Sequence, residues 1–180
     1  MINPDLLKNH LLELLEDYRK KWPEEASTID RFRNFVSTEN PLQGKENPRG
    51  HVTASAWILS RDGQKVLLTH HRKLNIWVQL GGHTDSAETW FDAALREARE
   101  ESGLEDLEPL GQALFDIDIH PIPPRLDTPG HFHYDLRFLF TADDRSPLSV
   151  TEESHDLKWV MLDRLEEYTQ DDSQLRMRKK

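Results

Sequence analysis

The apolar residues of the first 40 positions recur at the three- and four-residue spacing of amphipathic helices. Asn3 is a suitable N-cap and Pro4 suits the first turn, so one helix is predicted from here to Lys20, and Pro23 stops it. A second helix is predicted over residues 24–36. The apolar positions on the two helices are Leu6, Leu7, Leu11, Leu14, Leu15 and Tyr18, followed by Ile29, Phe32, Phe35 and Val36.

From residue 51 onwards the pattern changes to the two-residue period of β-strands. Residues 61–64, Arg-Asp-Gly-Gln, form a turn signal between the first two strands and indicate a hairpin. A long helix is predicted over residues 85–102 and a short one over 163–168. The predicted strands cover residues 51–60, 65–71, 76–80, 116–120, 131–140 and 157–162. Strands interleaved with helices in this order predict a layered α/β (α+β) domain with a mixed sheet.

Residues 41–50 are rich in Pro, Gly and Asn and are predicted to form a linker. The chain is therefore divided into a helical N-terminal extension over residues 1–45 and an α/β domain over residues 46–172. Residues 173–180 are expected to form a frayed C-terminal tail.

Composition narrows the classes of partner. The net charge of −10 disfavours nucleic-acid backbones and anionic membranes, so neither DNA nor a membrane is expected as a partner. A phosphorylated small molecule stays compatible, because a bound cation can invert the local charge. The chain has no cysteine, which excludes disulfides, thiolate metal sites and a cysteine nucleophile. With no visible signal segment at the N-terminus, a cytoplasmic location is expected.

Three glutamates, Glu97, Glu100 and Glu101, share one face of the predicted central helix. Acidic faces are usually just solvated, and each like-charge pair costs only about 0.2–0.5 kcal/mol, so repulsion does not exclude that interpretation. The alternative is a site for a hard divalent cation. Mg²⁺ prefers oxygen ligands and is commonly held by one or two carboxylates together with substrate phosphates.

Glycines flank this helix. Gly81 and Gly82 precede it and would let the backbone approach a ligand closely. Asp85 and Glu88 have the spacing of a capping box, with Asp85 as N-cap, and Gly103 is placed to end the helix. The apolar stripe predicted for the helix consists of Ala87, Phe91, Ala94 and Ala98.

The stretch from Gly82 to Leu104 resembles the Nudix box, the signature of hydrolases acting on nucleoside diphosphates linked to another moiety. All seven fixed positions match, and a match of this kind arises by chance in about one window in 10⁸ at average residue usage. These positions are Gly82, Glu88, Arg96, Glu97, Glu100, Glu101 and Gly103. The resemblance implies a Nudix-like α/β/α sandwich with a mixed sheet, and it makes residues 46–172 a Nudix hydrolase domain.

The same resemblance implies roles for the matching residues. Glu97, Glu100, Glu101 and the backbone carbonyl of Gly81 are expected to bind Mg²⁺ (or Mn²⁺). Arg96 is expected to act in catalysis by orienting the carboxylates through charge-assisted hydrogen bonds. Structural roles are expected for Gly82, Glu88 and Gly103.

The implied reaction is attack of a metal-activated water at phosphorus, without a covalent nucleophile. Members of the family take the proton of this water with different carboxylates, either in the box or on a loop before the last strand. Glu97 represents the first kind here. Glu153, six residues before Trp159, represents the second, and Glu152 and Asp156 are its rivals. An acidic surface loop explains the second group equally well.

Polar and apolar residues alternate along residues 131–140, so one face of this strand is polar. That face carries His131, His133, Asp135 and Arg137. A sheet with one solvated face gives the same alternation, but a pair of histidines on one face favours a substrate-binding surface. Transition-metal ligation by the two histidines is a lesser alternative.

Two more residues are expected to contact substrate. The resemblance implies that Arg72 lies where a basic residue often contacts phosphate. His83 follows the glycine pair, where substrate-facing side chains often lie.

The function expected from these features is hydrolysis of a diphosphate linkage in a nucleotide-like small molecule. A nucleotide-sensing Nudix-like module is the alternative, although such modules typically lose box glutamates and all are present here. A diphosphate isomerase is a weaker alternative, because that related family uses a catalytic cysteine. The N-terminal helices are expected either to cap the cleft or to form a homodimer.

Overall fold

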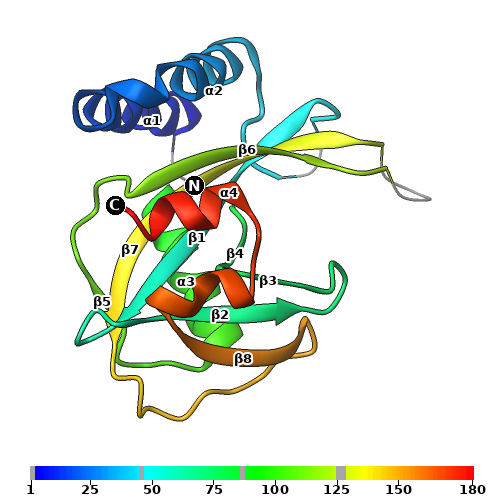
Figure 1. Ribbon diagram of the computed structural model, residues 1–180. Coiled ribbons are helices and arrows are strands. Elements are labelled where there is room, and N and C mark those ends of the chain that lie inside the picture. Colours follow the sequence, from blue (N-terminus) through cyan, green and yellow to red (C-terminus); the bar gives the residue numbers. More distant parts are fainter. Residues whose placement is uncertain (1–2, 45–46, 86–87, 125–128) are drawn as a thin grey trace.

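The computed structural model describes residues 3–44, 47–85, 88–124 and 129–180, and Figure 1 shows their arrangement. The helices are α1 (Pro4–Lys21), α2 (Ala26–Thr38), α3 (Trp90–Ser102) and α4 (Asp172–Met177), with 3-10 turns at Pro23–Glu25 and Leu162–Glu167. The strands are β1 (Gly50–Ser60), β2 (Lys65–His71), β3 (Ile76–Val78), β4 (Leu80–His83), β5 (Glu108–Pro109), β6 (Asp116–Ile122), β7 (His131–Ala142) and β8 (Ser154–Met161).

The described strands form one mixed sheet, as predicted. The two longest strands, β1 and β7, run parallel to each other along their whole length, from Gly50 opposite Phe132 to Ser60 opposite Ala142. The other pairings are antiparallel: β2 and β4 pair with β1, β5 and β6 with β7, and β3 and β8 with β2. Of the strands between β1 and β7 in the sequence, β2 and β4 therefore extend the sheet beside β1, whereas β5 and β6 extend it beside β7.

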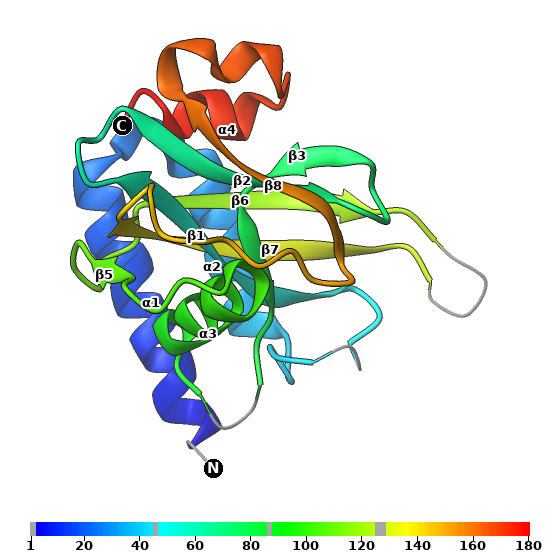
Figure 2. The same cartoon turned by 90° about the horizontal axis from the view of Figure 1, so that it is seen from below.

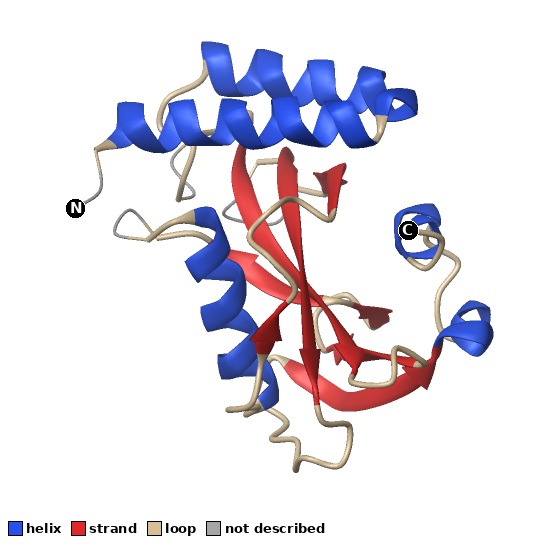
Figure 3. Cartoon of the chain, turned by 90° about the vertical axis from the view of Figure 1, so that its left-hand side faces the viewer, coloured by secondary structure: helices blue, strands red, loops and turns tan. Residues whose placement is uncertain are grey.

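Helices cover the sheet on several sides, which confirms the predicted α/β sandwich with an N-terminal helical extension. In Figure 3, α3 and α4 lie on opposite sides of the sheet, while α1 and α2 lie side by side across one end of it. Leu11, Ile29 and Phe32 belong to the same core cluster as residues of the sheet and α3. The N-terminal helices are therefore packed into the domain rather than tethered to it.

The first helix begins as the sequence predicts. The side chain of Asn3 caps it by accepting a hydrogen bond from the amide of Asp5 at 2.9 Å. The second helix begins at Ala26, because Pro23–Glu25 first forms a 3-10 turn. Among the described helices, none has the length and apolar character needed to cross a bilayer.

The central helix α3 begins later than predicted. Thr89, not Asp85, is its N-cap, and the Thr89 side chain accepts a hydrogen bond from the amide of Asp92. Glu88 still accepts a hydrogen bond from the amide of Asp85 at 2.8 Å, so this pair braces the loop before the helix. The predicted apolar position Ala87 lies outside the described residues. Gly103 ends α3 in the left-handed conformation, with φ of 72°.

The predicted strand over residues 76–80 is two strands with different partners. Residues of β3 pair with β2, whereas β4 pairs with β1. The change of partner carries Gly81 and Gly82 over the middle of β1, next to Ser55 and Ala54.

The expectation of a frayed C-terminal tail is wrong. Residues Asp172–Met177 form α4, and Met177 is buried in a second core cluster with Trp57 and Val66. The side chain of Lys180 is 3% exposed and forms ion pairs with Glu25 and Asp116. The buried charges hold the end of the chain against the sheet. The predicted domain boundary between residues 45 and 46 lies outside the described residues.

Candidate functional site

The glutamates of α3 line a cleft together with the glycine loop and the loop before β8. Figure 2 shows α3 beside the central strands. The cleft has a volume of about 350 Å³. Its lining residues are Gly82, His83, Glu97, Glu100, Glu101, Thr151 and Glu153. Four carboxylates thus meet in one hollow, from two segments that are 52 residues apart at their nearest, Glu101 and Glu153.

Glu101 is the most buried of these carboxylates, with 7% of its surface exposed. Burial, followed by repulsion from Glu97, Glu153 and Glu100, raises its pKa to about 8, although the amide of Gly81 donates a hydrogen bond to it at 3.1 Å. Burial also raises the pKa of Glu97, despite the adjacent Arg96. The carboxylate oxygens thus gather in one place with too few positive charges nearby to balance them. Such a group of oxygen atoms is suited to bind a hard divalent cation such as Mg²⁺.

Arg96 connects the glutamates of α3 with the loop before this helix. Its guanidinium donates two hydrogen bonds to Glu88, at 2.8 and 3.0 Å, and one to Glu97 at 2.8 Å. It also donates to Glu100 at 3.1 Å and to the backbone carbonyl of His83 at 3.0 Å. These bonds connect the helix face with the loop that leads into it. They fix the carboxylate directions, which is the geometry expected of an orienting arginine.

The two glycines of β4 leave no room for side chains. A Cβ at Gly81 would lie 2.5 Å from the Ser55 hydroxyl oxygen and 2.7 Å from the Ala54 carbonyl oxygen. A Cβ at Gly82 would lie 2.6 Å from the carboxyl carbon of Glu97 and 2.7 Å from both of its oxygens. Only glycine lets this backbone touch the carboxylate cluster.

We expect the Gly82→Ala variant to lose activity with little loss of stability. The added methyl group must displace the Glu97 carboxylate, and a shift of about 1 Å at a reacting centre can cost roughly 10²-fold in rate. The measurement is kcat/KM together with the melting temperature. Gly111→Ala is the control for activity, because no described atom lies within 4 Å of its added Cβ; its φ of 106° strains any side chain, so this variant should lower the melting temperature but leave kcat/KM unchanged. Unchanged activity in Gly82→Ala would show that the Glu97 position is unimportant.

Arg72 contacts the loop that carries Glu153 and leads into β8, the Glu153 loop. Its amide donates a hydrogen bond to the carbonyl of Glu153 at 2.8 Å, and its guanidinium donates to the carbonyl of Ser154 at 3.0 Å. These contacts give Arg72 a role the sequence did not indicate, that of anchoring the loop. Glu153 lines the cleft, whereas neither Glu152 nor Asp156 is among the described lining residues.

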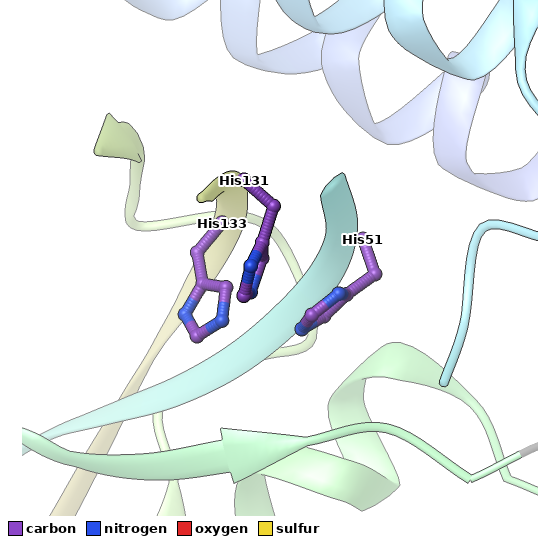
Figure 4. Close-up of side chains that lie close together, drawn as sticks. All are labelled: His51, His131 and His133. Atoms are coloured by element: carbon purple, nitrogen blue, oxygen red, sulfur yellow. The ribbon is translucent and has the colours of Figure 1, made fainter. Parts of the chain in front are cut away.

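The polar face of β7 divides into two parts. Figure 4 shows that His131 and His133 lie beside His51 of β1, with the three rings facing a common space. His133 is directly opposite His51 in the sheet register. Burial, followed by repulsion from neighbouring histidines, lowers the pKa of His133 to about 2. His83 joins this group, with its ring centre 4.9 Å from that of His51.

Asp135 and Arg137, the second part, are in the interior, which corrects their predicted contact with substrate. Asp135 is 2% exposed and accepts hydrogen bonds from the hydroxyls of Thr53 and Ser55. Arg137 is 3% exposed and pairs with Asp135 at 2.9 Å and with Asp116 at 3.0 Å. Helix α4 and the last residue cover this part of the polar face. The alternation of polar and apolar residues in β7 therefore does not indicate a solvent-exposed face at these two positions.

His51 is the residue of this region that the sequence analysis missed. It joins the histidine group only because β1 pairs with β7 in parallel. Its strand position was predicted, but local sequence carries no signal for which strands become neighbours. The strand register was therefore the missing information.

Comparison with protein families gives one match over most of the chain. The model of the NUDIX domain matches residues 49–179. This range includes the glycine loop, α3, the Glu153 loop and the C-terminal helix. It excludes α1 and α2.

Two curated proteins and one solved structure illustrate the relationship. The m7GpppN-mRNA hydrolase NUDT17 of Xenopus laevis is 36% identical over 77 residues, covering 40% of this chain and 25% of that protein. A probable DHNTP pyrophosphohydrolase of Lactococcus lactis is 29% identical over 111 residues, covering 61% of this chain and 64% of that protein. The chain thus spans less than two thirds of either relative's length.

Among solved structures, a NUDIX-family hydrolase from Clostridium perfringens is similar, with 27% sequence identity and a TM-score of 0.55. The match covers 74% of this chain and 95% of that structure. The two proteins therefore share a similar fold over the aligned part of this chain.

Proposed function

Because the chain belongs to the Nudix family, whose domain model matches residues 49–179, we propose that it is a divalent-metal-dependent pyrophosphohydrolase. Its substrate would be a nucleoside diphosphate linked to a further group, cleaved by attack of water at phosphorus. The observation that carries this proposal is the cleft in which Glu97, Glu100, Glu101 and Glu153 converge beside Gly82.

Mg²⁺ or Mn²⁺ bound there would neutralise the diphosphate oxygens and lower the pKa of a bound water. Glu97, Glu100 and Glu101 supply the carboxylate ligands, and the carbonyl of Gly81 lies in the same loop. Arg96 keeps the carboxylates aimed into the cleft through its hydrogen bonds to Glu97 and Glu100. A carboxylate of the cluster accepts the proton of the attacking water.

Glu153 is the proposed proton acceptor. It is exposed, its loop is anchored by Arg72, and it faces the box glutamates closely enough to raise the pKa of Glu97 and Glu101. A base on a separate loop can move with substrate while the α3 glutamates stay on the metal. Glu97 is the alternative base within the box.

We expect Glu153→Gln to lower kcat by roughly 10²–10⁴-fold, the usual contribution of a general base, with a small change in KM. The acid limb of the pH–rate profile should disappear as well, because the group that must be deprotonated is gone. Steady-state kinetics from pH 5 to pH 10 measures both effects.

Glu152→Gln is the matched control for this test, because Glu152 is the neighbouring exposed carboxylate and is not among the described residues that line the cleft. If Glu153→Gln and Glu152→Gln retain equal activity and the acid limb persists, the base is Glu97 or another group.

The substrate is best sought by product analysis across classes, with Mg²⁺, with Mn²⁺ and with EDTA. The relatives' names suggest two members of the panel, capped RNA and dihydroneopterin triphosphate. The others are nucleoside triphosphates, ADP-ribose, nucleotide sugars, dinucleoside polyphosphates and coenzyme A. Metal-dependent release of a phosphate-containing product from one class supports the proposal. His83 lines the cleft, where it could contact the substrate.

A nucleotide-sensing module is the competing proposal. A NUDIX domain of Shewanella oneidensis NrtR, 18% identical with a TM-score of 0.50, was crystallised with ADP ribose. The intact set of box glutamates favours an enzyme over a sensor. Tight nucleotide binding without turnover anywhere in the panel would favour the sensor. An isomerase of the cysteine-dependent kind is excluded by the absence of cysteine.

A further inference from the structure

Outside the glutamate cleft, a second group of side chains has the make-up of a metal site. His51, His131 and His133 each offer a ring nitrogen, and these three atoms lie within 4.8 Å of one another. The ring centres of His51 and His133 are 4.6 Å apart, and that of His131 is 5.1 Å from His51. Figure 4 shows the rings facing the same space from β1 and β7.

The sheet register brings these three rings together. His51 is opposite His133, and His131 is two positions from His133 on the same face of β7. Three strand positions with fixed backbone spacing therefore supply the nitrogens, which makes the set far more rigid than one on loops. In a tetrahedral site with Zn–N bonds of 2.0–2.1 Å, ligand nitrogens are about 3.3 Å apart, so small ring rotations would close this set around one ion.

A backbone contact of His131 supports the same interpretation. Its Nδ1 lies 2.9 Å from the carbonyl oxygen of Pro129, and a carbonyl can only accept a hydrogen bond. Nδ1 must therefore carry the proton, which leaves Nε2 with its lone pair directed away from that carbonyl. Histidines that bind metals usually have the other ring nitrogen held by a carbonyl or carboxylate in this manner.

We propose that His51, His131 and His133 bind a first-row transition-metal ion of the Zn²⁺ type, at a site separate from the box glutamates. Imidazole nitrogens suit Zn²⁺, Co²⁺ and Ni²⁺, whereas the oxygen ligands of the box suit Mg²⁺. The chain would then sort two kinds of ion between neighbouring sites by ligand type. Three protein ligands leave a fourth position open, as in catalytic rather than structural zinc sites.

The open position gives this second site a function. His83 lines the glutamate cleft, and its ring centre lies 4.9 Å from His51 and 5.4 Å from His133. An ion held by the histidines is therefore next to the cleft and can accept an anionic oxygen of a molecule bound there. The two ions would contact different parts of one phosphorylated ligand.

Cobalt absorption tests the proposal on the full-length protein without an activity assay. Metal-free protein is titrated with Co²⁺. The visible absorption of this ion is strong when it is four-coordinate, as expected for three histidines and one further ligand. It is weak when the ion is six-coordinate, as expected for oxygen ligands. The Glu101→Gln variant provides a background in which the box site is impaired. We expect one equivalent of Co²⁺ to give the strong bands in this background, and Zn²⁺ but not Mg²⁺ to abolish them.

The ligand test uses two histidine variants. His131→Ala should weaken Co²⁺ binding by roughly tenfold or more. Loss of a residue that only hydrogen-bonds a metal ligand already lowers metal affinity by roughly 10–100-fold, and His131 is proposed as a ligand itself. His155→Ala is the matched control, because His155 also lies beside another histidine, at 5.1 Å between ring centres, but outside the proposed site. It should bind Co²⁺ like the parent protein.

Three results would overturn the proposal: absence of the strong bands, equal Co²⁺ affinity in His131→Ala and the parent, or equal weakening in His155→Ala. Circular dichroism of each variant checks folding.

A measurement on the unaltered chain gives an independent answer. In its ¹⁵N–¹H imidazole spectrum, Zn²⁺ should shift the ring signals of three histidines, and an unchanged spectrum contradicts the site. Because Glu101→Gln is expected to retain the site, failure of the hydrolase proposal leaves this one standing.

Discussion

Replacing Glu101 with Gln is expected to lower kcat/KM by at least about 10²–10³-fold while leaving the unliganded protein no less stable. Loss of one preorganised electrostatic group at a reacting centre typically costs this much. Glu101 is the most buried carboxylate of the cleft and receives a hydrogen bond from the amide of Gly81. An amide side chain keeps that bond but supplies no negative charge to a cation.

The stability half of this prediction follows from the raised pKa. Glu101 has a pKa of about 8 in the folded state, above the ordinary value of 4.5, so between these values the folded state binds more protons than the unfolded one. Stability contributed by this group is therefore lost as the pH rises through about 8. Gln removes the charge that causes the loss. Stability without metal should thus be equal or higher near pH 8.

Melting curves with and without Mg²⁺ measure the second effect, because a ligand that binds only the folded state raises the melting temperature. The parent protein should be stabilised by Mg²⁺, and Glu101→Gln should not. Glu105→Gln, an exposed change four residues beyond, is the control and should behave like the parent. Full activity in Glu101→Gln would remove this residue from the metal site.

Asp116→Asn is expected to destabilise the fold by about 3–5 kcal/mol, the usual cost of removing one partner from a buried ion pair. Asp116 is 0% exposed. Its carboxylate pairs with Lys180 at 2.6 Å, with Arg176 at 2.7 Å and with Arg137 at 3.0 Å. The amide would leave these three cations without their central partner.

The pH dependence of stability should change in the same variant. Burial alone would raise the pKa of Asp116, but the hydrogen bond from Arg176 and the charges of Arg137 and Lys180 lower it below its ordinary value. A carboxyl group of this kind contributes stability that is present above its unfolded pKa and is lost as the pH falls through its folded pKa. Asp116→Asn should lack this acid-dependent loss.

Urea unfolding at pH 7 measures the loss of stability, and unfolding at steps from pH 4 down to pH 2 measures the pH dependence, because the folded pKa of Asp116 lies below the ordinary value of 3.8. Asp143→Asn is the control, because Asp143 forms a surface pair with the 85%-exposed Arg145 and such pairs contribute about 0–1 kcal/mol. Equal destabilisation by the two changes would mean that the buried network around Asp116 does not hold the C-terminal helix in place.

The sequence was most informative where short-range patterns determine structure. The spacing of Glu97, Glu100 and Glu101 on one helical turn placed them on one face, and the structure has them lining one cleft. Asn3 and Gly103 were recognised as helix ends because capping depends on adjacent residues alone. The alternation in β7 correctly placed its histidines on a common face.

Features that depend on distant partners could not be predicted in this way. The start of α3 moved to Trp90 because Glu88 and Arg96 engage each other across the loop, leaving Thr89 as the cap. Burial of Arg137 depends on α4, whose contact with β7 no local pattern indicates. His51 joins the histidine group only through the parallel pairing of β1 and β7.

The most direct test of the central claim is turnover in ¹⁸O-labelled water, with the best substrate of the panel and with Mg²⁺ or EDTA. We predict metal-dependent cleavage, with one ¹⁸O atom in a phosphate-containing product, and loss of this labelling in Glu101→Gln. Cleavage that persists in EDTA, cleavage without label at phosphorus, or no cleavage of any substrate class would contradict the claim that the glutamate cleft directs water at a diphosphate.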